Sequence, residues 1–271
     1  MKAARFDYVR PTTLPEALAL LAETPDAKLL AGGQTLGPML NLRLAQPPLL
    51  IDIARIAELA EVAEDRDGVT LGATITHAAI EDGRVTDPTA GFLARIAAGI
   101  GYRAVRTRGT IGGSLAHADP AADWLVALTA LGAELNLAAP DSRRRVALTG
   151  FVEGAMQTVL KANELITGVR LAKFSPAARF GYHKICRKAG EFAEAIAAVV
   201  HDPERGTYRY ATSTPAGGPL LIEANQAPLA AGGTLSELQQ RLTAAGFAGD
   251  AYETRLRAVA LARALKAMAA A

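Results

Sequence analysis

Two glycine-containing segments far apart in the chain constrain its fold and function more than any other feature. The first is residues 31–35 (AGGQT), directly after the apolar pair Leu29-Leu30, and the second is residues 109–114 (GTIGGS). Glycine lets a turn tighten and leaves main-chain N–H groups accessible, so a phosphate can approach the backbone closely. A hydroxyl residue, Thr35 or Ser114, ends each segment and adds a donor. We therefore expect a dinucleotide that is held from two sides.

Neither glycine segment matches a well-defined phosphate-binding motif. The Gly-x-Gly-x-x-Gly fingerprint and the Gly-x-x-x-x-Gly-Lys loop are both absent, and a Gly-Gly pair alone is usually an ordinary turn. The chain of 271 residues is long enough for one large domain or two ordinary ones. Its net charge of +2 gives no indication of nucleic-acid binding. Arginines cluster at 103–108, beside the second glycine segment, and at 143–145, where we expect an exposed hairpin.

The cysteine content limits the metal chemistry of this chain. Cys186 is the single cysteine, so no internal disulfide can form. One thiolate also cannot hold an iron–sulfur cluster or a structural zinc ion. The first residues lack the apolar core of a signal peptide, and no apolar run approaches the length that spans a membrane. These features predict a cytoplasmic protein without a transmembrane segment.

Cap residues and hydrophobic periodicity predict an α+β chain. Thr13, Pro15 and Glu16 form a capping box that opens a helix. Asp119-Pro120 is expected to start a helix that runs to Leu131. The other expected helices and strands of the amino-terminal part are helices after Thr76 and at 92–98, and strands at 28–30, 49–53, 69–73, 134–137, 145–148 and 164–171.

Composition changes near residues 173–178, where we place a domain boundary. Beyond it, alternating patterns predict antiparallel strands at 180–187, 194–201, 207–212 and 220–223. Two helices close the chain, with Ser236 and Asp250 as their expected N-caps. The carboxy-terminal part is therefore predicted to be a sheet with two helices.

Four blocks of sequence, in order, resemble one family. They are residues 31–44, 108–123, 164–169 and 182–193. Together they are similar to the FAD-binding medium subunit of molybdenum hydroxylases, which includes carbon monoxide dehydrogenase and, more distantly, the flavin domain of xanthine dehydrogenase. The resemblance covers the whole chain. Trp124 and Glu191 depart from the family pattern, where a smaller apolar residue and an aspartate are common.

The resemblance implies a specific domain organisation. Residues 1–174 would form an FAD-binding domain of the vanillyl-alcohol-oxidase (PCMH) type. FAD would lie between its two subdomains, roughly residues 1–55 and 56–174. Residues 175–271 would form a smaller carboxy-terminal domain with an antiparallel sheet and helices. The boundary inferred from composition agrees with this division.

The resemblance also implies which residues contact FAD. The two glycine segments would contact the pyrophosphate and its surroundings, Asp123 would accept hydrogen bonds from ribitol, ribose or ring donors, and Lys184 would place a cation near the reduced flavin. The expected cofactor contacts are Ala31, Gly32, Gly33, Gln34, Thr35, Leu36, Ile100, Gly109, Thr110, Ile111, Gly112, Gly113, Ser114, His117, Asp119, Asp123, Leu165, Ile166 and Lys184. No residue is expected to be a catalytic acid, base or nucleophile, and none a metal ligand.

Three residues close to this set are expected to have other roles. His77 is predicted to stand at a helix start. His183 neighbours Lys184 on a strand and should point to the opposite face. Tyr182 is likewise expected to point away from the cofactor.

The family implies an electron-transfer function. A substrate would be hydroxylated on a large molybdopterin subunit, and electrons would pass through [2Fe–2S] clusters on a small iron–sulfur subunit to FAD in this chain. They would leave to an external acceptor. The expected assembly is a dimer of heterotrimers. The resemblance does not specify the substrate or the terminal acceptor.

Two alternatives remain open from the sequence. A stand-alone FAD-dependent oxidase or dehydrogenase would have its own substrate pocket, and an organic substrate would reduce its flavin without partner chains. A degenerate scaffold would keep the fold without FAD, but the intact glycines and hydroxyls of both glycine segments argue against it. A bulky residue in place of Gly113 should abolish cofactor binding in either enzyme and change only stability in the scaffold.

Overall fold

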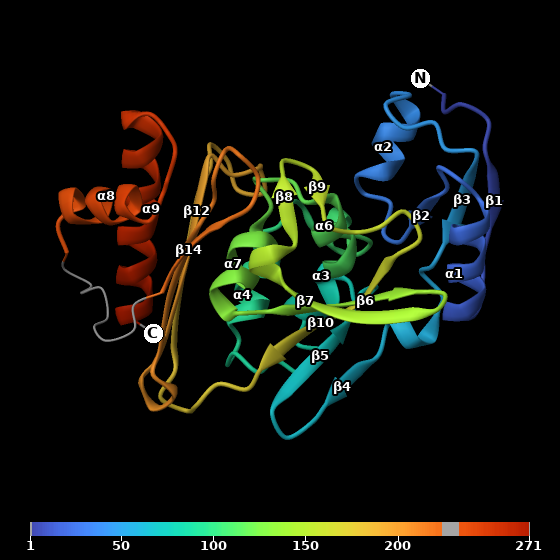
Figure 1. Cartoon of the computed structure of the whole chain (residues 1–271). Coiled ribbons are helices and arrows are strands. Elements are labelled where there is room, and N and C mark those ends of the chain that lie inside the picture. Colours follow the sequence, from blue (N-terminus) through green and yellow to red (C-terminus); the bar gives the residue numbers. More distant parts are fainter. Residues whose placement is uncertain (1, 224–232, 271) are drawn as a thin grey trace.

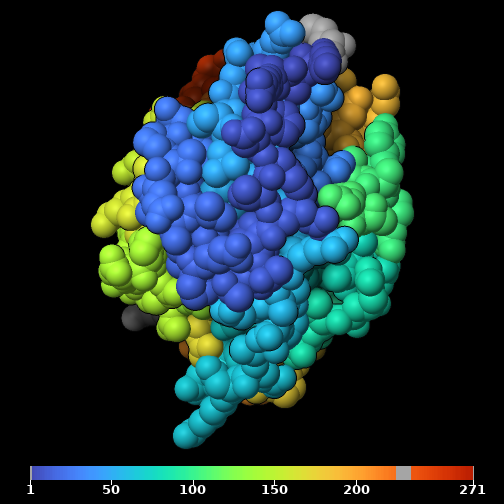
Figure 2. Space-filling view, turned by 90° about the vertical axis from the view of Figure 1, so that its right-hand side faces the viewer, coloured from blue at the N-terminus to red at the C-terminus, as the bar shows by residue number. Residues whose placement is uncertain are grey.

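The computed structural model describes residues 2–223 and 233–270 and contains three parts that follow one another along the chain. Figure 1 shows them side by side: the amino-terminal part in blue, a central part in cyan to yellow, and the carboxy-terminal part in orange to red. Each part has its own sheet. Seen from the amino-terminal side, the first part covers much of the face, and the hairpin between the first two strands of the central part projects below it (Figure 2).

The amino-terminal part is a parallel sheet of three strands with two helices. The strands are β1 (Asp7–Val9), β2 (Lys28–Leu30) and β3 (Leu49–Asp52), in the order β1-β3-β2, and the helices are α1 (Leu14–Glu23) and α2 (Leu36–Asn41). The Thr13 hydroxyl caps α1 by accepting from the Glu16 N–H, as predicted. Leu14, Leu18 and Leu21 recur on one face of α1 and are buried in a cluster that includes Ile51 of β3.

The central part is a five-stranded antiparallel sheet covered by short helices. Its strands are β4 (Val62–Glu64), β5 (Gly68–Gly72), β6 (Glu134–Ala139), β7 (Ser142–Ala147) and β10 (Leu165–Ala172), in the order β4-β5-β10-β6-β7. The helices are α3 (His77–Glu81), α4 (Phe92–Ala98), α5 (Arg103–Arg106), α6 (Ile111–His117) and α7 (Asp123–Leu131), and the smaller elements are η1 (Ala57–Leu59), η2 (Leu148–Gly150), β8 (Val152–Gly154) and β9 (Gln157–Thr158). Every residue of α7 is buried, because this helix also contacts the carboxy-terminal sheet.

The carboxy-terminal part is an antiparallel sheet whose four strands pair in chain order. They are β11 (Arg179–Ile185), β12 (Ala195–Asp202), β13 (Thr207–Thr212) and β14 (Leu220–Glu223), with η3 (Pro203–Arg205) between β12 and β13. Helices α8 (Leu235–Ala244) and α9 (Ala251–Ala269) follow, and α9 packs on β11 and β12. A Cβ at Gly181 would lie 2.1 Å from the Ala264 carbonyl oxygen, so the glycine permits this close packing. With α7 on the other face, β12 is almost entirely buried.

The predicted α+β class is confirmed, and three local predictions are wrong. Helix α7 begins at Asp123 rather than at Asp119-Pro120, since the Asp119 carboxylate accepts from the Ala121 N–H and holds a turn there. The N-cap of α8 is Thr234, which forms a capping box with Glu237, and not Ser236. The second glycine segment is the first turn of α6 rather than a free turn. Among the described residues, no helix is long and apolar enough to cross a membrane.

Candidate cofactor-binding site

A cavity of about 720 Å³ is bounded by residues from all three parts of the molecule. Its walls come from β2 and the segment after it, from the loops and helices between β5 and α7, and from the start of β10. Residues 190–192, in the loop before β12, complete the rim. This volume is in the range typical of sites that enclose a small molecule or cofactor.

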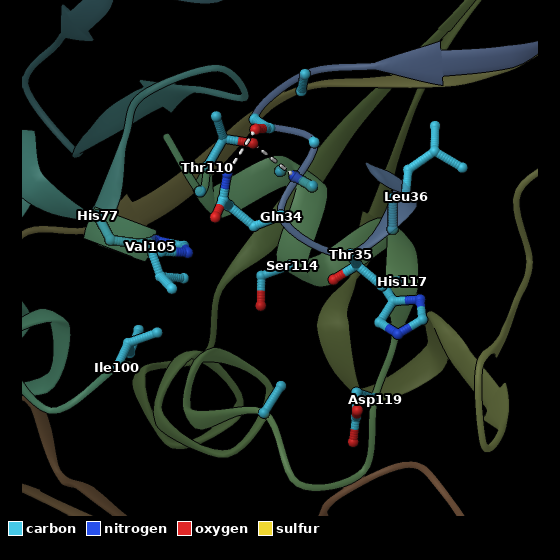
Figure 3. A pocket seen from close by; sticks show the side chains of 18 of the residues that line it. Gln34, Thr35, Leu36, His77, Ile100, Val105, Thr110, Ser114, His117 and Asp119 are labelled. Atoms are coloured by element: carbon cyan, nitrogen blue, oxygen red, sulfur yellow. Dashed lines mark hydrogen bonds between the residues drawn. The ribbon is translucent and has the colours of Figure 1, made fainter. Parts of the chain in front are cut away.

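The first glycine segment connects β2 to α2 and offers main-chain donors to the cavity. Gly33 has φ +70°, a left-handed conformation that glycine adopts easily. The Gln34 side-chain amide donates to the Gly32 carbonyl oxygen over 3.2 Å (Figure 3). Within the described residues, the N–H groups of Gly33, Gln34 and Thr35 donate no hydrogen bond to the chain. Such successive unpaired N–H groups favour an anion or another acceptor.

The second glycine segment uses its main-chain donors internally. The Ile111 N–H donates to the Ile75 carbonyl oxygen over 3.0 Å, and the Gly112 N–H donates to that of Ala73 over 2.9 Å. The Gly113 N–H donates to the Thr110 hydroxyl, which caps α6 (Figure 3). The expectation that both segments leave their N–H groups accessible is therefore wrong for the second, which contributes the Ser114 side chain instead.

The two glycine segments touch each other. A Cβ at Gly32 would lie 2.0 Å from the Arg108 carbonyl oxygen and 2.9 Å from the Gly109 Cα. A Cβ at Gly112 would lie 2.5 Å from the Ala73 Cβ. These glycines are needed so that the chain can pack against itself, and the close approach brings both segments to one cavity.

Polar and apolar side chains occupy different sides of the cavity. Figure 3 shows the hydroxyls of Thr35 and Ser114 on the side of His117 and Asp119, whereas Ile100 lies opposite, with Val105 and His77. The rim adds the exposed rings of Tyr102 and Phe192. The arrangement suits a long ligand with both a charged or hydroxylated portion and a flat apolar portion.

Seventeen of the nineteen predicted contact residues line this cavity, and two do not. The Ile111 side chain is fully buried in the central core. Lys184 lies behind the cavity wall, where its ammonium group donates to the Gly99 carbonyl oxygen over 2.7 Å and pairs with Asp123 at 2.9 Å. Whether the seventeen residues contact a cofactor stays a prediction.

Asp123 connects the cavity to a buried polar cluster. Its Oδ1 receives the Lys184 ammonium and the Tyr182 hydroxyl, and side-chain exposure is 10% for Asp123 and 9% for Lys184. Burial and the Asp123 charge raise the pKa of Tyr182 well above its usual value. The prediction that Tyr182 points away from this region is wrong, because residues two apart on β11 share a face. His183 does point the other way, toward Arg263 of α9.

Several cavity residues have no distinctive sequence signal. His77 starts α3, as predicted, but its ring also lines the cavity. Gly101 and Ile100 form part of the wall, and the Arg106 guanidinium holds both carbonyl oxygens at 3.0 and 3.1 Å. Arg106 is itself paired with Glu81 at 2.7 Å. The arginines beside the second glycine segment thus include one that positions the wall.

The family comparison matches most of the chain. Residues 4–173 match the model of the FAD binding domain in molybdopterin dehydrogenase. The chain is 37% identical over 213 residues to the caffeine dehydrogenase subunit beta of Pseudomonas sp. (strain CBB1), covering 78% of this chain and 72% of that protein. It is 40% identical over 197 residues to the carbon monoxide dehydrogenase medium chain of Hydrogenophaga pseudoflava, covering 72% of this chain and 69% of that protein.

A solved structure extends this likeness to the carboxy-terminal part. Carbon monoxide dehydrogenase from Hydrogenophaga pseudoflava, in a form that lacks the Mo-pyranopterin moiety of its cofactor, contains a similar chain. The TM-score is 0.87 and the identity 34%, covering 100% of this chain and 99% of that one. The fold, the cavity and these matches show that the chain belongs to the family of FAD-binding subunits of molybdopterin dehydrogenases.

Proposed function

We propose that this chain is the FAD-binding electron-transfer subunit of a multi-subunit molybdenum hydroxylase, and that FAD lies in the cavity between the two glycine segments. Electrons would arrive from [2Fe–2S] clusters on a small partner subunit and leave to an external acceptor. The substrate would react on a large molybdopterin subunit, in a dimer of heterotrimers. The single cysteine supports this division, because the clusters need thiolates from another chain.

The residues along the cavity fit FAD. The unpaired N–H groups of residues 33–35 suit a pyrophosphate, and the Thr35 and Ser114 hydroxyls supply two further donors beside them. Leu165 and Ile166, at the start of β10, offer apolar surface for a flat ring. Bound FAD can accept electrons one at a time and release them in pairs, which is the chemistry required between an iron–sulfur cluster and a two-electron acceptor.

In this proposal the side chains of the cavity bind and orient FAD, and none takes part in a chemical step. Asp123 faces the cavity with one carboxylate oxygen already shared by Lys184 and Tyr182, which leaves Oδ2 to accept from the ligand. Tyr182 and Lys184 hold this carboxylate in one orientation. Phe192 and Tyr102 are exposed at the rim, so apolar surface beside the cavity is available for contact with a partner subunit. We also propose that residues 1–174 and 175–271 are the two domains, in line with the separate sheets of the chain.

One observation carries the proposal: two glycine segments whose Gly32 and Gly112 are 80 positions apart, in a chain of the FAD-binding family, meet at one cavity. The test begins with the purified full chain and added FAD. We expect flavin absorbance to be retained after gel filtration, with quenched flavin fluorescence. A chain that takes up no FAD would overturn the proposed cofactor site.

The second arm tests electron transfer. Partner chains are co-purified with the full chain, and flavin reduction is followed with candidate substrates under anaerobic conditions. We expect reduction only when a molybdopterin chain and an iron–sulfur chain are present. Reduction by an organic substrate with this chain alone would support the stand-alone oxidase instead.

A further inference from the structure

His77 and Trp124 form a polar pair beside the cavity that the proposed FAD contacts do not include. His77 is 5% exposed, and Trp124, in the first turn of α7, is fully buried. The Trp124 Nε1 lies 3.1 Å from the His77 Nδ1, and their ring centroids are 6.0 Å apart. The two residues come from helices that begin 46 positions apart, so the pair joins separate segments of the central part.

This hydrogen bond determines where the proton of the imidazole lies. An indole N–H can only donate, so the His77 Nδ1 must accept and carries no proton. The proton of the neutral ring is therefore on Nε2. Burial, together with the nearby Arg106 charge, lowers the pKa of His77 to about 4, so the ring is neutral near pH 7.

The geometry leaves the Nε2–H facing the cavity. The His77 main-chain N–H donates to the Gly109 carbonyl oxygen over 2.9 Å, which ties the residue to the second glycine segment. A Cβ at Gly109 would lie 2.9 Å from the His77 Nε2, so this nitrogen is next to the glycine backbone. Within residues 2–223 and 233–270, Nε2 has no hydrogen-bond partner. Figure 3 shows the ring next to Val105, on the wall opposite His117.

We propose that Trp124 locks His77 in the Nε2–H tautomer, and that this N–H donates a hydrogen bond to an oxygen or ring nitrogen of the bound FAD. His77 is then a binding residue, and Trp124 is a positioning residue that acts through it. The inference rests on the proposed location of FAD. A neutral donor orients an acceptor atom without adding charge to the cavity, which distinguishes His77 from a lysine or arginine at the same place.

The hydrogen-bonding atoms predict the behaviour of three variants. His77→Leu removes the donor, and Trp124→Phe removes the group that fixes the tautomer. His77→Gln places an amide N–H at nearly the reach of Nε2 and should rescue binding. We expect the dissociation constant for FAD to rise roughly 3- to 10-fold in His77→Leu, less in Trp124→Phe, and little in His77→Gln. His183→Leu is the matched control, because that ring faces α9 on the far side of β11.

The test combines FAD titration of the full chain with ¹⁵N–¹H spectra of selectively labelled histidines, of which the chain has four. In the wild type we expect a protonated Nε2 and a bare Nδ1 for His77, and a shift of the Nε2–H signal when FAD is added. In Trp124→Phe the two tautomers should mix. Circular dichroism identifies any variant that fails to fold.

Each outcome has a defined meaning. A wild-type chain that binds FAD while the His77 signal stays unchanged, and while His77→Leu binds equally well, overturns this inference and leaves the proposed function intact. A wild-type chain that binds no FAD overturns the proposed function itself. A protonated Nδ1 in the wild type disproves the tautomer lock, whatever the affinity.

Discussion

The two glycine segments have similar sequences but different structures. Residues 31–35 form a turn that is shaped by Gly33 at φ +70° and leaves successive N–H groups unpaired. Residues 109–114 enter helix α6, and three main-chain hydrogen bonds tie residues 109–112 to residues 73–77. In the first segment Gly33 provides a left-handed conformation and Gly32 provides space for the second segment, whereas no glycine of the second segment has a positive φ and its glycines provide space alone. Glycines that look equivalent in sequence can therefore serve binding in one place and packing in another.

The largest expected effect comes from adding a methyl group to the second segment. In Gly112→Ala, the new Cβ would lie 2.5 Å from the Ala73 Cβ and 2.7 Å from the Ala73 carbonyl oxygen. We expect the free energy of unfolding to fall by about 3 kcal/mol, the upper end for overpacking. FAD affinity should fall roughly 100-fold if only the undistorted segment binds. Gly37→Ala is the control, because a Cβ there meets nothing within 4 Å. Denaturant unfolding and FAD titration measure both effects, and equal stability of the two variants would contradict the packing role.

Lowering the pH should destabilise the second glycine segment more than the first. The pKa of His77, which contacts the second segment, is about 4 in the folded chain against 6.5 for the free side chain. Between about pH 4 and pH 6.5 the histidine is protonated in the unfolded chain but neutral in the folded chain. The stability that the neutral, buried His77 contributes is therefore complete above about pH 6.5 and is lost as the pH falls toward about 4. The loss should reach about 2 kcal/mol at pH 5.

Denaturant unfolding of the chain without FAD, between pH 7 and pH 5, measures this change. The comparison is with His77→Gln, which removes this titration while His183 and His201 still titrate. The protection of amide hydrogens against exchange, corrected for the slower intrinsic exchange in acid, should fall more in residues 109–114 than in residues 31–35. Identical pH profiles for the two proteins would show that His77 is not responsible.

The smallest effects come from the two threonines and distinguish the segments most directly. The Thr110 hydroxyl caps α6 by accepting from the Gly113 N–H, whereas the Thr35 hydroxyl makes no cap hydrogen bond with α2. Thr110→Ala should cost about 1 kcal/mol of stability. Thr35→Ala should change stability by less than about 0.5 kcal/mol and weaken FAD binding roughly 3- to 10-fold. Melting curves and FAD titrations of both variants measure these effects. If Thr35→Ala were destabilised as much as Thr110→Ala, the proposed difference between a binding threonine and a capping threonine would be wrong.

Local sequence signals predicted most of the elements. The helix at 92–98 and the strands at 207–212 and 220–223 have the predicted bounds. These segments combine a clear period with strong boundary signals, such as Gly99 after α4. Short elements with little periodicity, including β1, α2 and β8, were not predicted because segments of three to six residues carry too weak a hydrophobic pattern, and β1 in addition pairs with the distant strand β3.

The family resemblance predicted most of the residues that line the cavity, but it did not predict that His77 and residues 190–192 line it as well. Helix propensity argues against two adjacent glycines in a first turn, but the bonds to Ala73 and Ile75 impose that conformation on residues 111–113. The cavity positions of His77 and residues 190–192 depend on tertiary packing that no short motif encodes. Lys184 was predicted to contact FAD only as a family expectation, and its ion pair with Asp123 behind the cavity wall was not predicted, because strand alternation does not indicate what a side chain contacts.

The cavity wall is spread over the chain from Lys28 to Phe192. Gly190, at φ +84°, contributes to this: a Cβ there would lie 2.8 Å from the Gly101 carbonyl oxygen, so the loop before β12 closes directly onto the wall. During synthesis, amino-terminal regions leave the ribosome first and begin to fold first. The last wall residues emerge only after more than two thirds of the chain has been made. The cavity therefore cannot have all its walls until residues 190–192 have been made, so FAD binding at the proposed site comes late in the synthesis of the chain or after it.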